Sequence, residues 1–218
     1  MIVSMRAVTK NRVPGYFFST VIGSERSELR SNVTPSASHC MSNISRKTVS
    51  RYSLSILILE AMKSMSMDIG FGDVVSPCPM SLDYPLLLTN IPSIQIQAYS
   101  LETVIAEKFH TMIDRDVSNS RMKDFYDCHQ LLTRHHINDQ TLYDAICATF
   151  DNRQLEYNPD LQLFTPEFAA DAKRNVRWNS FLKKINVVDA VTFQETMCVI
   201  IDRLYPLYTQ YWLQNKRV

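Results

Sequence analysis

The spacing of apolar positions changes from the period of a strand to that of a helix near residue 100. Before that point Met65, Met67 and Ile69 alternate with polar residues, which is typical of a half-buried strand. The apolar run SLSILILE and the alternating segment IQIQA predict two more strands, at 53–60 and 94–98. Beyond residue 100 we predict helices at 101–113, 121–132, 138–150, 165–181 and 193–204.

The order of these elements predicts an α+β fold, in which a small sheet is followed by a helical lobe. We divide the chain into residues 1–50, a sheet at 51–99 and a helical lobe at 100–218. Serines interrupt every period in residues 1–50, so we expect loop or poorly ordered chain there, apart from a short strand in YFFSTVIGS. We also expect Pro206 to break or kink the last helix.

Lys108 lies on the apolar face of the helix predicted at 101–113. At about 100° per residue, Val104 and Ile105 lie one turn before it and Met112 lies one turn after it. Burying an unpaired ammonium costs on the order of several kcal/mol. This lysine therefore has to reach solvent, pair with a carboxylate or meet an anionic ligand.

The next predicted helix, RMKDFYDCHQLL, supplies the carboxylates for such a pair. Asp124 and Asp127 lie on it, and Arg115 projects from the same side of the preceding helix as Lys108. We expect the two helices to direct these cations and acids into a common polar pocket. On the residues alone, a structural salt bridge between Lys108 and Asp124 is the simpler interpretation.

The composition excludes several classes of protein. The 218 residues carry a formal net charge of +1, so any nucleic-acid binding requires a local basic patch rather than a global field. No apolar run is long enough to span a membrane and no hydrophobic leader is present, so we expect a cytoplasmic protein. Five cysteines without a CxxC pair indicate buried free thiols rather than a zinc site.

Three strings together resemble a known family: DIGFGDVVSP, SLETVIAEKFHTMIDR and RMKDFYDCHQLL. They are similar to the motifs of the AbiEii family, nucleotidyltransferase-like toxins of bacterial abortive-infection and toxin–antitoxin systems. The resemblance is close over 67–132 and looser over the helices that follow. It implies a partial nucleotidyltransferase-like sheet before a helical lobe, transfer of a nucleotide from an NTP to an RNA such as tRNA, and a cognate antitoxin.

The resemblance also implies roles for single residues. Lys108 matches the lysine of the family's AEK motif, which is expected to contact the nucleotide phosphates. Asp124 and Asp127 match the two acids of the KDxxD motif. Together with Lys108 they are the expected catalytic residues.

Three further positions complete the site that the resemblance implies. Arg115 and Lys123 are expected to bind the nucleotide beside Lys108, and Asp68 in the DIGFGD string is the expected Mg²⁺ ligand. These residue types suit nucleotidyl transfer, because cations stabilise phosphates and carboxylates bind divalent ions.

One part of a nucleotidyltransferase site is missing from the sequence. Such folds place a glycine-serine turn before a D-x-D pair that holds Mg²⁺ at the edge of a strand. Gly23 and Ser24 can stand for the turn, but no aspartate precedes Asp68. Two hypotheses therefore stay open: a Mg²⁺-dependent nucleotidyltransferase, and a non-catalytic remnant with a degenerate N-terminus that binds nucleotide or an antitoxin.

Other residues suggest alternative sites that we rank lower. His110 is expected opposite the apolar stripe, and His135 and His136 at a helix end, which favours solvated roles over metal binding. The C-terminal tyrosines and tryptophan are expected to pack against the helical lobe rather than stack on bases. An RNA-cleaving toxin needs an arginine and a histidine at short helical spacing, and Arg121 and His129 are too far apart.

Overall fold

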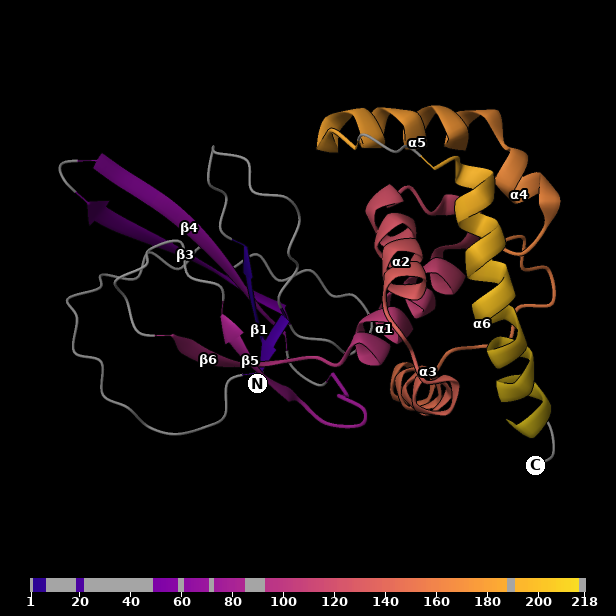
Figure 1. Cartoon of the computed structure of the whole chain (residues 1–218), viewed down its shortest axis with the longest axis horizontal. Helices are drawn as coiled ribbons and strands as arrows, with labels where there is room; N and C mark the ends of the chain where they lie inside the picture. The colour runs from indigo at the N-terminus through magenta and orange to yellow at the C-terminus, as the bar shows by residue number, and fades with distance from the viewer. Residues whose placement is uncertain are drawn as a thin grey trace. The chain divides into compact units, whose positions relative to one another are not determined.

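The computed structural model describes residues 2–6, 19–21, 49–58, 61–70, 73–84, 93–187 and 191–215, and before residue 73 it describes the backbone alone. The chain packs as two compact units, Met1–Ser100 and Leu101–Val218. The described strands belong to the first unit and the described helices to the second (Figure 1). This separation of strands from helices confirms the predicted α+β class.

The described strands of the first unit form one sheet in the order β3-β4-β1-β2-β6-β5, and every pairing in it is antiparallel. The strands are β1 (Ile2–Arg6), β2 (Ser19–Val21), β3 (Val49–Ile58), β4 (Ala61–Gly70), β5 (Met80–Tyr84) and β6 (Ile94–Ala98). The β3–β4 hairpin pairs Ile58 with Ala61, so its connection is short.

Strands β2, β3, β4 and β6 lie where the sequence predicts them. On β6, Gln95 and Gln97 are exposed and Ala98 is buried, as a half-buried strand requires. The sequence predicts neither β1 nor β5, and β1 lies within residues 1–50, most of which fall outside the described residues. On β5 only Leu82 is partly buried, so backbone pairing with β6 rather than an apolar period defines this strand.

The second unit is helical. Its elements are α1 (Leu101–Arg115), the 3₁₀ helix η1 (Asp116–Ser118), α2 (Met122–Arg134), α3 (Asp139–Arg153), α4 (Pro166–Ala170), α5 (Ala172–Ile185) and α6 (Phe193–Asn215). The side chain of Asn138 caps α3 and that of Thr165 caps α4, at the two starts that the sequence predicts. The single helix predicted at 165–181 is wrong, because Asp171 turns the chain with a ψ of 120° and caps α5 separately.

Helix α6 also differs from the prediction, because it continues past Pro206 to Asn215. Proline removes one backbone donor from the helix. Tyr208 and Tyr211 beyond it are buried, and the Tyr211 hydroxyl donates to Asp151 of α3 at 2.6 Å. Burial and this hydrogen bond outweigh the lost backbone bond, so the helix is not interrupted.

The long helices of the second unit share one core. Its largest fully buried side chains are Trp178, Phe109, Phe125, Phe150, Phe193, Ile105, Met112, Leu142, Ile146, Leu163, Met197 and Ile200. The ring of Tyr211 packs edge-to-face on Phe150 at 5.1 Å, which confirms that the C-terminal aromatic residues pack within the lobe. None of the described helices is long and apolar enough to cross a membrane.

Arg174 joins the start of α5 to the segment between α1 and α2. Its guanidinium donates to the carbonyls of Phe168 at 3.3 Å and Val117 at 3.0 Å, and lies 3.6 Å from the centre of the Phe168 ring. The side chain is buried, and this burial lowers the pKa of Arg174. A buried cation therefore fixes η1 against α4 and α5.

Candidate functional site

Lys108 lies in the middle of α1, on its buried face. Its apolar neighbours Ile105, Phe109 and Met112 have no exposed surface, and the lysine itself is only 8% exposed. The prediction that this ammonium lies within an apolar stripe is therefore confirmed. At such a position the charge needs a partner inside the protein.

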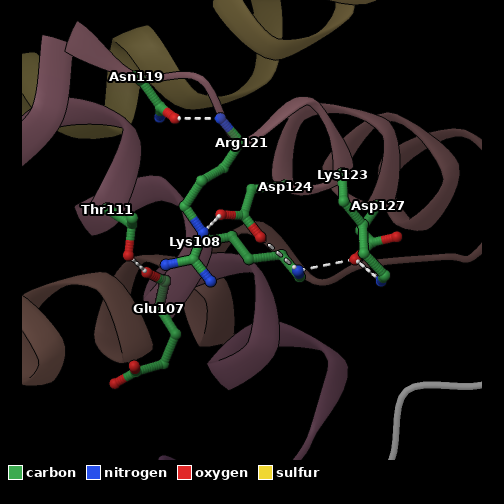
Figure 2. A network of polar contacts seen from close by, with 8 residues as sticks. All are labelled: Glu107, Lys108, Thr111, Asn119, Arg121, Lys123, Asp124 and Asp127. Atoms are coloured by element: carbon green, nitrogen blue, oxygen red, sulfur yellow. Dashed lines mark hydrogen bonds and ion pairs between the residues drawn. The ribbon is translucent and has the colours of Figure 1, made fainter. Parts of the chain in front are cut away.

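Two carboxylates from α2 supply that partner. The Lys108 ammonium donates to Asp124 Oδ1 at 3.0 Å and to Asp127 Oδ2 at 2.7 Å (Figure 2). Asp124 and Asp127 are one turn apart on α2, so both face α1. The structure thus confirms the expectation that the two helices direct these side chains toward each other.

Burial and charge act in opposite directions on Lys108. Burial lowers its pKa, while the carboxylates of Asp127 and Asp124 raise it, and the net result is a pKa above 10.5. The lysine is therefore firmly protonated at neutral pH. The thiol of Cys128, one residue after Asp127, has its pKa raised to about 12 by burial, so it is not a nucleophile at neutral pH.

Two more cations surround the carboxylates on the solvent side. Arg121 Nε lies 3.1 Å from Asp124 Oδ2, and Lys123 Nζ lies 2.5 Å from Asp127 Oδ2. The side chains of Arg121 and Lys123 are 53% and 43% exposed. We call Lys108, Arg121, Lys123, Asp124 and Asp127 the Lys108 cluster. Its three cations and two carboxylates give a net charge of +1 beside solvent.

Asn119 sets the start of the helix that carries the cluster. It is completely buried, and its Oδ1 accepts the backbone N–H of Arg121 at 2.9 Å (Figure 2). This bond anchors the chain one residue before α2 begins and so orients the Arg121 side chain toward Asp124. Arg121 is not predicted to belong to the cluster, although its position three residues before Asp124 suits a helical ion pair.

The nucleotidyl transferase AbiEii toxin family, from type IV toxin–antitoxin systems, has a family model that matches residues 26–197. The chain belongs to the AbiEii family. Neither the curated proteins nor the solved structures gave a match to the chain. The family makes the chain a nucleotidyl transferase toxin by descent and implies a cognate antitoxin as its partner.

The AbiEii match includes every site residue predicted from the sequence. Of these residues, the structure brings together Lys108, Asp124, Asp127 and Lys123. Arg115 is exposed at the end of α1 and forms no ion pair with any residue in the described ranges. Asp68 lies on β4, where its backbone pairs with Ser4 of β1 and Arg51 of β3. The side chain of Asp68 lies outside the described residues.

The described part of this AbiEii chain holds no group of three or more His, Cys, Asp or Glu side chains that could bind a metal ion. Asp124 and Asp127 are bonded to cations instead. Aspartates with D-x-D spacing occur at Asp114, near the end of α1, and at Asp116, which begins η1 and whose Oδ2 accepts the Gln162 N–H. The described residues therefore do not fit Mg²⁺. The cysteines among them are free thiols, as predicted, but Cys78 and Cys198 are exposed, so the prediction of burial is wrong for these two.

His110 corrects a sequence prediction, because it is buried rather than solvated. Its Nδ1 lies 3.1 Å from a guanidinium nitrogen of Arg153, which also pairs with Glu107. The ring packs against Phe150 of α3 at 6.0 Å. Helix α1 is thus covered on two sides, by α2 and by α3, which a single apolar stripe does not reveal. His135 and His136 are exposed after α2, as predicted.

Proposed function

We propose that this AbiEii chain transfers a nucleotidyl group from an NTP to an RNA acceptor, with the NTP phosphates bound at the Lys108 cluster. The observation that carries this proposal is the excess positive charge of the cluster beside solvent, built on carboxylates that a buried lysine holds in place. Phosphates are bound in proteins by such fixed cations. Family membership supports the same reaction class.

The shared oxygen of Asp127 allows an exchange of partners. Lys108 and Lys123 both donate to Asp127 Oδ2. When Lys123 turns to an incoming phosphate, Lys108 still neutralises Asp127, so no carboxylate is left unpaired. Arg121 pairs with Asp124 through Nε. Its two terminal nitrogens can therefore donate to a second phosphate oxygen while the pair with Asp124 stays intact.

In the proposed reaction the acceptor hydroxyl attacks the α-phosphorus of the NTP. A new bond forms between the acceptor oxygen and phosphorus, the bond to the pyrophosphate oxygen breaks, and the hydroxyl proton passes to a carboxylate of the cluster. Lys108 fixes Asp124 and Asp127 for this role, while Arg121 and Lys123 stabilise the negative charge on the phosphates. No step is assigned to a metal, since the described residues do not fit one.

Transfer of labelled nucleotide tests this proposal directly. With each of the four NTPs and a tRNA pool, wild type should label RNA and Lys108→Met should not. Lys123→Gln should bind NTP about tenfold more weakly by calorimetry, because one charge-assisted phosphate contact is lost. Arg203→Gln is the control: it removes an exposed ion pair with Asp139 on another helix and should change neither value. No labelling by wild type under any of these conditions would contradict catalysis.

A second candidate is a nucleotide-binding or antitoxin-binding protein without catalysis. The observation that favours it is the lack of any aspartate before Asp68, where the family site expects its metal-binding pair. Calorimetry together with the labelling assay separates the two candidates. A non-catalytic binder binds NTP, or only an antitoxin, and labels no RNA with any of the four NTPs, whereas the proposed transferase both binds NTP and labels RNA.

A further inference from the structure

Helix α5 carries a local concentration of positive charge in a nearly neutral chain. Between Ala172 and Ile185 it has five lysines and arginines and no acidic residue, while the whole chain has a net charge of +1. One of the five, Arg174, is buried at the η1 junction. The other four are exposed.

Three of the exposed cations share one face. At about 100° per residue, Lys173, Arg177 and Lys184 fall within about 40° of one another and span about 16 Å of helix. We call them the α5 basic stripe. None of the three forms an ion pair with a residue in the described ranges.

Helix stability explains only one of the three residues of the stripe. Cations near a helix C-terminus interact favourably with the helix dipole, which accounts for Lys183 and Lys184 in the last turn. Lys173 lies in the first turn, near the positive end of the dipole, which the capping carboxylate of Asp171 offsets in part. A cation at this end gains nothing from the dipole, so helix stability does not account for Lys173.

Aromatic packing places the stripe next to the Lys108 cluster. Phe181 follows Arg177 by four residues and precedes Lys184 by three, so it lies one turn from both. Its ring packs on Tyr126 of α2 at 5.7 Å. Tyr126 directly precedes Asp127 and is one turn from Lys123. Figure 1 shows α5 beside α2 within the helical unit. The cations of α5 and the exposed cations of the cluster therefore lie on neighbouring helices.

We propose that the α5 basic stripe binds the phosphodiester backbone of the RNA acceptor and positions its reactive hydroxyl at the Lys108 cluster. This inference rests on the proposed function. A row of unpaired cations beside half-buried aromatic rings complements an RNA backbone in charge. Its place next to the candidate nucleotide site suits the acceptor, which has to approach the NTP.

Fluorescence anisotropy with a labelled RNA hairpin that has a single-stranded 3′ end tests the proposal. The triple variant K173Q/R177Q/K184Q should bind this RNA roughly 100-fold more weakly at 0.1 M salt, from about fivefold for each lost phosphate contact. The slope of log affinity against log salt should become shallower by about 2 to 3. All three residues are exposed, so circular dichroism should show an unchanged fold.

A charge-matched control removes three cations outside the stripe, each changed to glutamine: Arg134 of α2, Lys183 on another face of α5 and Arg203 of α6. It should keep wild-type RNA affinity within about threefold, because the same net charge is lost away from the stripe. If both triple variants bound RNA equally weakly, the proposal would be overturned, because RNA affinity would then depend on net charge alone and not on the stripe. Undetectable RNA binding by wild type at low salt would overturn it too, as would stripe-dependent binding of polyglutamate without RNA binding, which indicates an acidic protein.

NTP affinity measured on the same samples separates this inference from the proposed function. The stripe variant should bind NTP as wild type does. If the stripe variant bound both NTP and RNA as wild type does, the proposed RNA-binding role of the stripe would be contradicted and the proposed nucleotide site would not. Stripe-dependent RNA binding without any NTP binding would support the stripe and defeat the proposed nucleotide site.

Discussion

Lys108 and Arg174 are both buried in the helical unit, at 8% and 7% exposure, but opposite kinds of partner hold them. Two carboxylates neutralise Lys108 and raise its pKa. Arg174 is held by carbonyl oxygens and an aromatic face, its nearest carboxylate lies 3.7 Å away, and burial lowers its pKa.

The difference separates a site from a structural junction. The carboxylates that hold Lys108 also touch two exposed cations, so its partners can be exchanged with a ligand from solvent. The carbonyls that hold Arg174 belong to the backbone, and no other cation among the described residues bonds to them. We therefore expect substitutions at Arg174 to act on stability and substitutions around Lys108 to act on binding.

The largest effect on stability is expected from Arg174→Met. It leaves the carbonyls of Phe168 and Val117 without their donor and removes the contact with the Phe168 ring, so unfolding should require about 3 kcal/mol less. Urea denaturation measures this value. Arg174→Lys should recover only part of it, because an ammonium lacks the planar fork that reaches both carbonyls. A loss of less than about 1 kcal/mol in the free energy of unfolding of Arg174→Met would show that Arg174 is not a structural junction.

Lys108→Met should cost less, about 2 kcal/mol in the same urea experiment. Removing one partner of a buried ion pair is destabilising, but Arg121 and Lys123 still neutralise Asp124 and Asp127 after the substitution. The double variant Lys108→Met with Asp127→Leu should be closer to wild type than the sum of the single changes. If the losses in unfolding free energy of the two single variants simply added in the double variant, Lys108 and Asp127 would have no coupling energy despite their short distance.

Alkaline pH gives a smaller effect that distinguishes the two cations. A lysine whose pKa is raised by folding contributes stability that is complete below the unfolded value of 10.5 and is lost as pH rises through the folded value. The stability difference between wild type and Lys108→Met should therefore be constant from pH 8 to about pH 10 and shrink above it. Arg174→Met, measured in parallel, should show no such change, because arginine stays protonated over this range.

The smallest change is expected from Lys123→Met, below about 0.5 kcal/mol. Lys123 donates to the same carboxylate oxygen as Lys108 but is 43% exposed, and exposed ion pairs contribute little to stability. Urea denaturation of Lys123→Met and Lys108→Met side by side compares two lysines that donate to the same oxygen of Asp127. If Lys123→Met lowered the free energy of unfolding as much as Lys108→Met does, burial would not explain the expected difference between the two lysines.

The sequence predicts the Lys108 side of the comparison and misses the Arg174 side for a physical reason. Helical periodicity places Lys108 on an apolar stripe and Asp124 and Asp127 one turn apart on the next helix, so local spacing is enough. Arg174 bonds to a carbonyl 57 residues away, and no local pattern records that contact. The burial of His110 under α3 escapes the sequence for the same reason, since it depends on which helix packs where.

The contacts of Lys108 with Asp124 and Asp127 span only 16 and 19 residues. Contacts of such low sequence separation require closure of a short loop and are among the first that a chain can make. The Lys108 pairs therefore need only α1 and α2, whereas the Arg174 junction has to wait for α5. On an emerging nascent chain, the charge cluster can assemble before the rest of the helical unit has been synthesised.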